Sequence, residues 1–332
     1  MLVPFDKFSG CLLGQCLGDA LGQPVEGFPS DECLDYLHRQ VMPLWHDKQV
    51  QAAHPFGQYT DDSQMARELL VSLVTYPEFN ADDYIARLKP LFEEGLAIVP
   101  GLACVDAMRR IAAGVPWQEA GCLPPQAGNG SAMRAAPVGM LFYETPEQML
   151  QIARKQGWIT HRDLRCDAGS IAVAGAVALA LQGRVEASYF CEQLAEWMTE
   201  VEGEFATYVR RLPEFVSLRP EDAVEWIAQA GKPVGYDDSW SGISPFVVGT
   251  VLWSLYCFLR TPGDYYASVW TSIAVGGDVD TTGAITGAIS GAFNGRSSLP
   301  THLLEMLHDH GGWRLDELED LCSRAYTKSM AL

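Results

Sequence analysis

The sequence has few of the features that mark specialised protein classes. Its nine cysteines are scattered and odd in number, without a C-x-x-C pair, so neither a disulfide framework nor a cysteine-based metal site is expected. Basic residues are also scarce: 23 Lys and Arg stand against 42 Asp and Glu, which gives a formal net charge of −19. Nucleic acid and anionic membranes attract basic surfaces, and this charge disfavours both as the main partner.

Long apolar runs and β patterns are missing as well. No stretch reaches about 18 uncharged apolar residues without a glycine, and the N-terminus does not resemble a signal peptide. We therefore expect no membrane segment and a cytoplasmic location. Alternating β-type runs, low-complexity segments and a composition break that would mark a linker are all absent. With 48% apolar and 20% charged residues, the sequence predicts one all-α domain over residues 1–332, and we expect a monomer.

An acidic pair followed by regularly spaced small residues stands out in the segment 275–295. Asp278, Asp280 and Thr281 form a D-x-D-T sequence, and such oxygen ligands suit a hard divalent cation such as Mg²⁺ or Mn²⁺. Glycine costs about 1 kcal/mol relative to alanine inside a helix. Its recurrence at every fourth position therefore predicts a buried helix over 281–293 that packs very close to another backbone. The alternative is that the two carboxylates only cap this helix.

A second acidic turn has the same content. Thr60, Asp61 and Asp62 precede apolar residues at i+4 spacing, which places them in the first turn of a helix. A purely structural interpretation is again open, because the helix dipole favours acidic residues there by about 0.3–1 kcal/mol each. If the fold brings the two acidic turns together, four carboxylates would repel one another unless cations balance them. Two divalent ions would do so, and the pairing is a hypothesis.

A glycine ladder also marks the first helix of the chain. Gly10, Gly14 and Gly18 recur at i+4, so this helix too is expected to pack along a glycine face. The Gln23-Pro24 step should end it and leave Glu26 on a loop. Taken alone, Glu26 is a typical solvated surface carboxylate.

Three further segments are candidates for binding. In Gly128-Asn129-Gly130-Ser131 the glycines would let backbone N–H groups approach a phosphate, although a plain turn explains them too. Thr160 and Asp163 have the spacing of a capping box, and His161 beside them could be a structural hydrogen bonder. Two amphipathic helices are expected over 186–230. The polar loop 231–242 carries Tyr236 and Trp240.

These motifs together resemble the ADP-ribosylglycohydrolase family, which includes the dinitrogenase-reductase-activating glycohydrolases and the ADP-ribosylhydrolases. The resemblance covers about residues 8–295. The motifs, in the family's order, are GDALGQPVE at 18–26, YTDDSQM at 59–65, GNGSAMRAAPVG at 128–139, TH at 160–161 and GGDVDTTGAITGAISGA at 276–292.

The resemblance implies a single compact orthogonal helical domain with two Mg²⁺ or Mn²⁺ ions at the bottom of a cleft that binds ADP-ribose. It implies that Glu26 lies on a loop near the metals and that His161 lies near the substrate. The loop 128–134, including Met133, would hold the diphosphate and ribose. The implied metal ligands are Thr60, Asp61, Asp62, Asp278, Asp280 and Thr281.

One departure from the family concerns the residues just before the GNG segment. Many relatives carry an aromatic residue there, whereas this chain has the sequence PPQA at 124–127. Stacking on the base or ribose would then have to come from Tyr236 or Trp240.

The implied activity is hydrolysis of the glycosidic bond between ADP-ribose and a protein side chain or a small-molecule acceptor, with Asp62 or Glu26 assisting proton transfer. Two other functions stay open at this level. A non-catalytic family member could bind ADP-ribose or serve a structural role. The D-x-D-x-T sequence at 278–282 also fits the nucleophile motif of haloacid-dehalogenase-like phosphohydrolases, which should end a parallel strand.

Overall fold

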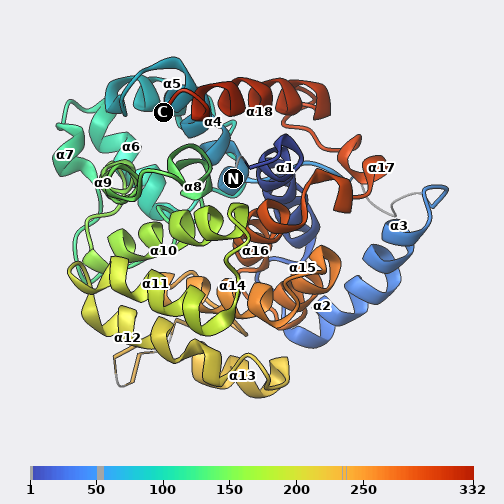
Figure 1. The fold of residues 1–332 in the computed structure, drawn as a ribbon. Coiled ribbons are helices and arrows are strands. Elements are labelled where there is room, and N and C mark those ends of the chain that lie inside the picture. The colour runs from blue at the N-terminus through green and yellow to red at the C-terminus, as the bar shows by residue number, and fades with distance from the viewer. Residues whose placement is uncertain (1–2, 51–55, 234, 237) are drawn as a thin grey trace.

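The computed structural model describes residues 3–50, 56–233, 235–236 and 238–332, and within these ranges it contains helices and isolated backbone bridges but no β-strand (Figure 1). The expected all-α fold is thereby confirmed. The α-helices are α1 Phe5–Gly22, α2 Ser30–Tyr36, α3 Met42–His46, α4 Asp61–Thr75, α5 Ala81–Glu93, α6 Leu102–Ala112, α7 Trp117–Ala120, α8 Ala136–Phe142, α9 Pro146–Gly157, α10 Leu164–Leu181, α11 Ala187–Thr199, α12 Gly203–Arg211, α13 Pro220–Ile227, α14 Val247–Arg260, α15 Tyr265–Ala274, α16 Val279–Asn294, α17 Thr301–Leu304 and α18 Leu315–Ser329.

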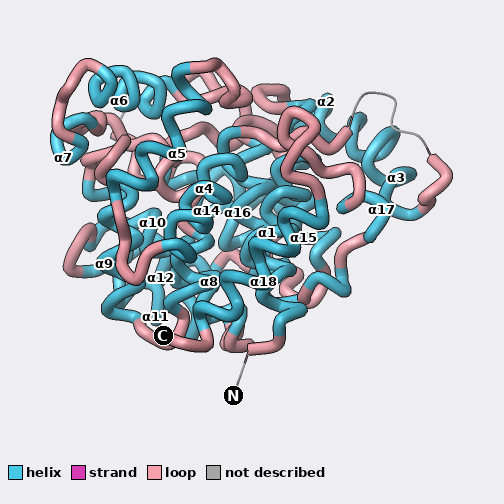
Figure 2. The backbone as a smooth tube through the Cα atoms, turned by 90° about the horizontal axis from the view of Figure 1, so that it is seen from above, coloured by secondary structure: helices cyan, strands magenta, loops and turns pink. Residues whose placement is uncertain are grey.

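The centre of the molecule is an antiparallel pair formed by α1 and α16, which lie side by side in Figures 1 and 2. The two glycine ladders face each other: a Cβ atom on Gly14 would lie 2.4 Å from the carbonyl oxygen of Gly287, and one on Gly18 would lie 2.1 Å from that of Gly283. Only glycine permits so close a backbone approach. The predicted helix over 281–293 is therefore present, extended slightly at both ends.

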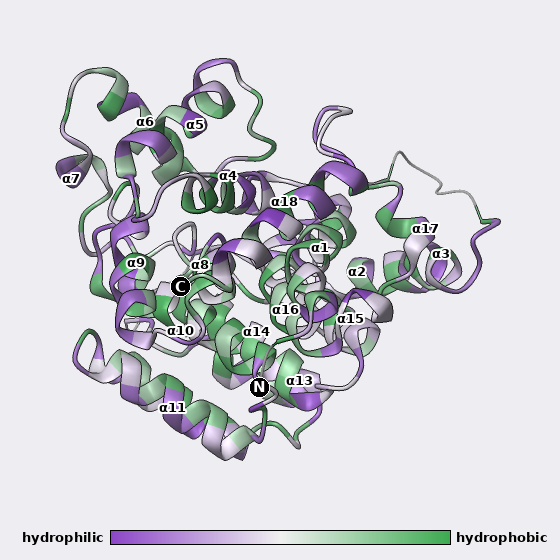
Figure 3. Cartoon of the chain, turned by 45° about the horizontal axis from the view of Figure 1, so that its top comes forward, coloured by the Kyte–Doolittle hydropathy of each residue, from purple (hydrophilic) through white to green (hydrophobic). Residues whose placement is uncertain are grey.

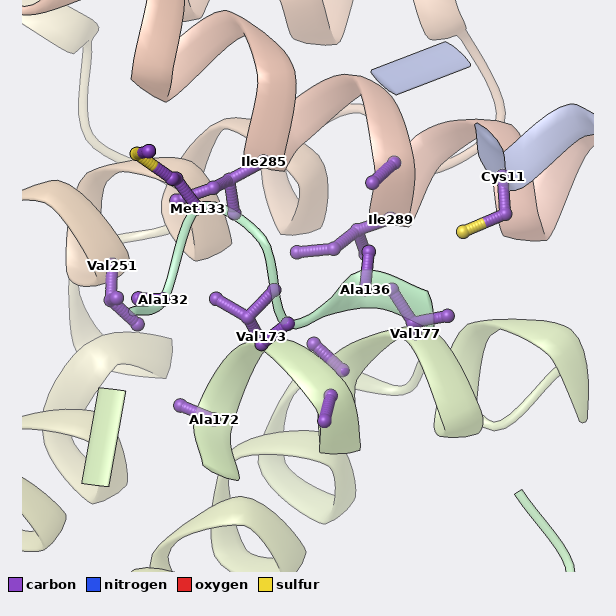
Figure 4. Packing of buried hydrophobic residues seen from close by; sticks show 14 of the residues in the cluster. Cys11, Ala132, Met133, Ala136, Ala172, Val173, Val177, Val251, Ile285 and Ile289 are labelled. Atoms are coloured by element: carbon purple, nitrogen blue, oxygen red, sulfur yellow. The ribbon is translucent and has the colours of Figure 1, made fainter. Parts of the chain in front are cut away.

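The hydrophobic core surrounds this pair. Ile285 and Ile289 of α16 point toward Val173 and Val177 of α10, and Val251 of α14 lies at the same cluster (Figure 4). Within the described ranges α10 alone has the length and hydropathy of a membrane span. Its residues from 166 to 181 are all buried, as expected for the central helix of a core.

The outer helices are amphipathic and cover the core with one face. On α11 the apolar residues Phe190, Leu194 and Met198 recur at i+4 and are buried, while polar residues occupy the other side (Figure 3). The expectation of two helices over 186–230 was wrong, because the Pro220 segment starts a third, α13. Proline suits the first turn of a helix, where its missing N–H costs nothing.

The capping box predicted from Thr160 and Asp163 was also wrong. Asp163 is itself the N-cap of α10, and its carboxylate accepts the backbone N–H of Arg165 at 2.9 Å. Thr160 lies before the helix, and its side chain is bonded to Arg134 and His161 instead. The three-residue spacing of Thr160 and Asp163 is compatible with Thr160 as an N-cap and with Asp163 as the N-cap. In the structure the buried Arg134 takes up the Thr160 hydroxyl, and Asp163 caps the helix.

Candidate active site

The acidic turn of α16 is built on two glycines. Gly276 and Gly277 have φ values of 79° and 95°, which side chains with a Cβ rarely adopt. A Cβ there would also meet the backbone of Phe28 or Ile243 at 2.5 Å or less. The Asp278 N–H donates to the carbonyl of Ile243 at 2.7 Å. The glycine pair thus lets the chain pass between the backbone at Phe28 and the backbone at Ile243. This contact fixes the position of the turn that carries Asp278 and Asp280.

Glu26 is attached to the same place by backbone hydrogen bonds. The N–H of Gly27 donates to the carbonyl of Gly277 at 2.8 Å. Oxygen atoms of Glu26, Asp278 and Asp280 lie within 4.8 Å of one another. Glu26 is therefore half-buried among other acids, and the interpretation as a solvated surface carboxylate was wrong.

The turn at the start of α4 supplies the other carboxylates. Thr60 is the N-cap, and its hydroxyl accepts the N–H of Asp62 at 3.4 Å. Asp61 and Asp62 are almost wholly buried. Among the described residues, neither Oδ2 of Asp61 nor Oδ1 of Asp62 has a hydrogen-bond partner. Helix capping therefore accounts for Thr60 but leaves two buried carboxylate oxygens unexplained.

A fifth buried aspartate was missed by sequence reasoning. Asp19 lies in α1, directly after Gly18, and is fully buried. Its two oxygens accept the backbone N–H groups of Thr60 at 2.9 Å and Ser63 at 3.1 Å, so α1 caps the N-terminus of α4 from outside. An aspartate inside an otherwise apolar helix, next to its glycine face, was the signal that could have revealed it.

The C-terminal segment also supports this turn, which the sequence did not indicate. The Gln64 amide donates to the carbonyl of Leu96 at 3.0 Å and to Asp309 at 2.7 Å, and its oxygen accepts the N–H of Ile98 at 3.0 Å. Asp309 also pairs with the buried Arg67 at 2.7 Å. These bonds hold the loop 96–101, whose last residues form one wall of the site.

One cavity of about 430 Å³ is lined by Glu26, Asp61, Asp62, Asp278 and Asp280, whereas Asp19 and Asp309 lie outside its lining. Neither lysine nor arginine occurs among its described lining residues. Burial, and secondly the charge of Asp280, raises the pKa of Asp19 and of Glu26 to about 7. The same two causes raise the pKa of Asp61 and Asp62 well above the usual value. The cavity therefore gathers acidic groups whose ionised forms the protein itself does not balance with positive charge.

The donor set fits divalent cations. Carboxylate and hydroxyl oxygens are the ligands that Mg²⁺ and Mn²⁺ prefer, and the unpartnered oxygens of Asp61 and Asp62 are free to bind an ion. Thr281 lines the cavity, whereas Thr60 is fully buried behind it. Five of the six residues predicted as ligands thus line the same cavity as Glu26, and Thr60 is the one that does not.

The GNG segment contributes differently from a simple phosphate loop. Gly128 and Gly130 pack against the imidazole of His161: a Cβ on Gly130 would lie 2.7 Å from its Cε1 atom. Asn129 donates from its side-chain amide to Asp278 and therefore orients a carboxylate of the site. Ser131 is fully buried, and its hydroxyl donates to the carbonyl of Cys166 at 3.2 Å.

The remaining predicted binding residues lie along two adjoining cavities. Met133 and His161 line the carboxylate cavity. A second cavity of about 570 Å³ adjoins it and is lined by Tyr236 and Phe246. Trp240 borders both cavities, so the two aromatic residues proposed for stacking lie at and beyond the mouth of the acidic site.

Neither alternative interpretation of residues 278–282, as helix caps or as a haloacid-dehalogenase motif, fits the structure. Asp278 occupies the N-cap position of α16 without a side-chain capping bond. The carboxylate of Asp280 accepts the N–H of Thr281 at 2.8 Å and is also hydrogen-bonded to the side chain of Asp278. The haloacid-dehalogenase interpretation requires the motif to end a parallel strand. Here it begins a helix, and the described part of the chain contains no strand.

Comparisons with known proteins find relatives that match almost the whole chain. ADP-ribosylhydrolase ARH3 of Bos taurus is 29% identical, with 98% of this chain and 94% of that protein covered. An uncharacterised protein of Archaeoglobus fulgidus is 27% identical over 98% of both chains. A solved structure described as an ADP-ribosylglycohydrolase-related protein complex superimposes with a TM-score of 0.69 at 28% identity, over 98% of this chain and 99% of that one.

The family comparison covers almost every residue. The model of the family described as ADP-ribosylglycohydrolase matches residues 2–331, a range that contains both acidic turns, Glu26 and the GNG segment. The resemblance stated from the motifs is therefore confirmed, and this chain belongs to the ADP-ribosylglycohydrolase family.

Proposed function

We propose that this protein uses two divalent cations, Mg²⁺ or Mn²⁺, to hydrolyse the glycosidic bond between ADP-ribose and a modified protein side chain or another ADP-ribosylated acceptor. Family membership identifies it as a hydrolase of ADP-ribose glycosidic bonds. The observation that carries the finer proposal is the convergence of two acidic turns and Glu26 on one cavity without a lysine or arginine among its described lining residues.

The chain's own residues would act on the substrate as follows. Glycoside hydrolysis passes through an oxocarbenium-like transition state, and the crowded aspartates would stabilise the positive charge that develops at C1″ of the ribose. Water adds to C1″ as the bond between C1″ and the acceptor breaks. One proton of the water passes to Glu26 or Asp62, and the same carboxyl group then gives a proton to the departing acceptor. Burial and the charge of Asp280 raise the pKa of Glu26 to about 7 in the cation-free site. Bound cations would lower this pKa and so favour the ionised carboxylate, which is the form that accepts a proton.

The proposed cation ligands are Thr60, Asp61, Asp62, Asp278, Asp280 and Thr281. When bound, the cations would supply Lewis acidity to the attacking water and the ribose hydroxyls. Asp19 and Asn129 would keep the ligands in place, because they bond the α4 turn and Asp278 respectively. Partners of this kind typically change metal affinity by 10- to 100-fold.

Addition of Mg²⁺ or Mn²⁺ after chelation is expected to raise the melting temperature. The ions bind only the folded state and remove the repulsion among buried carboxylates; at 100 times Kd this amounts to about 2.7 kcal/mol. Differential scanning calorimetry measures the shift.

The variant Asp280→Asn tests whether the change in melting temperature comes from the acidic cavity. Without cations the variant should melt above the wild type, because the charge that most perturbs its acidic neighbours is gone, and the cation-induced shift should shrink. Asp35→Asn, at an exposed carboxylate of α2, should behave as wild type. If neither Mg²⁺ nor Mn²⁺ changes the melting temperature of the chelated wild type, the proposed metal site is contradicted.

The acceptor linkage is best identified with a panel of defined substrates. Arginine-linked, serine-linked and nucleic-acid-linked ADP-ribose and a small-molecule conjugate should be compared for release of ADP-ribose with each cation. Relatives named as ADP-ribosylhydrolase ARH3 and ADP-ribosylarginine hydrolase Tri1 make protein linkages the first to test. If cations bind but no linkage is cleaved, the protein is a binding member of the family rather than an enzyme.

We further propose a single-domain monomer in the cytoplasm. All nine cysteines are free and buried, which suits a reducing compartment. The acidic net charge continues to disfavour nucleic acid and anionic membranes as partners.

A further inference from the structure

The imidazole of His161 is held from one side by a buried chain of hydrogen bonds. Its Nδ1 lies 2.8 Å from the Thr160 hydroxyl, which in turn accepts a hydrogen bond from Nη2 of Arg134 at 2.8 Å. Arg134 is fully buried and also donates to the carbonyl of Gly130 at 2.9 Å and to the side chain of Gln156 at 2.7 Å. A further hydrogen bond, to the backbone carbonyl of Gln156 at 2.9 Å, also holds the guanidinium in place.

The chemistry of these groups fixes the direction of each hydrogen bond. A guanidinium can only donate, so Arg134 fills one lone pair of the Thr160 oxygen. The hydroxyl hydrogen of Thr160 then has two neighbours, Nδ1 of His161 and the thiol of Cys104. Burial raises the pKa of the Cys104 thiol to about 12, so this sulfur keeps its hydrogen and is a weak acceptor. The hydrogen therefore goes to Nδ1.

We propose that Arg134 and Thr160 are positioning residues that lock His161 into the neutral tautomer with its hydrogen on Nε2, so that Nε2 donates a hydrogen bond to an oxygen of the bound substrate. His161 lines the carboxylate cavity. The hydrogen bonds of the described residues leave Nε2 without a protein partner, while Nδ1 is occupied. Because one nitrogen of a neutral imidazole donates and the other accepts, occupation of Nδ1 as an acceptor defines Nε2 as the donor.

Two features keep the imidazole of His161 neutral and hold its ring in one orientation. Burial, and secondly the positive charge of Arg134, lowers the pKa of His161 to about 3. The ring lies against Gly128 and Gly130, where a Cβ would come within 3.2 Å of Nε2 or 2.7 Å of Cε1. The two glycines of the GNG motif therefore leave space for a ring of fixed orientation.

A fixed Nε2–H donor selects its partner by chemistry. The group opposite must be an oxygen with a free lone pair, such as an oxygen of the ribose or diphosphate. The identity of this acceptor rests on the proposed function, whereas the tautomer does not. A cation or an ammonium group at this position would be rejected, since it has no lone pair to offer.

The tautomer is measured by NMR on the full-length protein labelled with ¹⁵N-histidine. Two-bond ¹H–¹⁵N correlations distinguish the Nε2–H form, the Nδ1–H form and the imidazolium of each of the seven histidines, and the spectrum of His161→Gln assigns the signals of His161. We expect the Nε2–H form in the wild type without ligand. The Nδ1–H form, the imidazolium or an averaged signal would overturn the proposal.

Variants of Thr160 test the origin of the lock. Thr160→Val keeps the shape but removes the hydroxyl, so the His161 signals should move toward the Nδ1–H form or toward an average. Thr160→Ser keeps the hydroxyl and should retain the Nε2–H form. If Thr160→Val does not fold, the wild-type and serine spectra still decide. A Thr160→Val spectrum identical to wild type would show that Thr160 does not fix the tautomer.

Binding of ADP-ribose separates this inference from the proposed function. Thr160→Val and His161→Asn should weaken ADP-ribose binding by about 5- to 10-fold, the net effect of one hydrogen bond. His161→Gln, whose amide nitrogen lies near the place of Nε2, should bind more tightly than His161→Asn. If the Nε2–H form is present but ADP-ribose does not bind the wild type, the proposed function is contradicted. The role of Arg134 and Thr160 in fixing the tautomer of His161 is then still supported. Equal binding by the Gln and Asn variants would contradict the donor role of Nε2.

Discussion

Replacement of Asp62 or Asp280 by alanine is expected to abolish release of ADP-ribose, with kcat lower by more than about 100-fold, since even the partners of metal ligands usually cost 10- to 100-fold. Each substitution removes a buried carboxylate from the cavity that Glu26 and four aspartates line. The helical circular dichroism should be kept, because neither side chain fills the hydrophobic core. Release of ADP-ribose from the best substrate of the panel, measured with saturating cation, gives the rate.

Asp35→Ala is the matched control for these two variants. It removes a carboxylate that is exposed on α2 and pairs with Arg39, four residues later, so its rate should equal that of the wild type. Full activity in either the Asp62 or the Asp280 variant would mean that the two acidic turns do not form one catalytic site.

Gly287→Ala is expected to unfold the protein or to lower its free energy of unfolding by more than about 4 kcal/mol, a size reserved for a few severe mechanisms. The new Cβ would lie 2.2 Å from the carbonyl oxygen of Gly14 and 3.0 Å from the hydroxyl of Tyr265. The Tyr265 hydroxyl donates a hydrogen bond to the Gly14 carbonyl, so moving either group away from the new Cβ would break this bond. Urea unfolding followed by circular dichroism measures the effect.

A glycine in open space provides the comparison. Gly203 begins α12, and a Cβ there would meet no atom within 4 Å. Gly203→Ala should therefore leave the urea midpoint unchanged or raise it, by up to about 1 kcal/mol in stability. If Gly287→Ala unfolds at the same urea concentration as the wild type, the close contact between α1 and α16 does not exist in solution.

The parts of the site that sequence reasoning found are those whose cause is local. Glycines at every fourth position and acids at a helix start are visible without knowledge of the fold, and they identified α1, α16 and both acidic turns. The pairing of these turns stayed a hypothesis, because the four-residue spacing of Gly14 and of Gly287 fixes a helix face but not its partner.

The parts that it missed depend on contacts between distant segments. Asp19 caps a helix that begins 42 residues later in the chain, and Asp309 reaches Gln64 from the C-terminal segment. The error at Thr160 has the same origin. Its hydroxyl could cap a helix or bond to His161, and the distant Arg134 determined which of the two occurs.

The antiparallel contact between α1 and α16 has a consequence for biosynthesis. The first helix leaves the ribosome long before its partner: at about 5–20 residues per second, the interval is on the order of 10–50 s. During this time Gly10, Gly14 and Gly18 have no surface to pack against, and the apolar residues beside them stay accessible to chaperones. The carboxylates cannot gather until α16 has been made, so a nascent chain acquires its capacity for cations only at the end of translation.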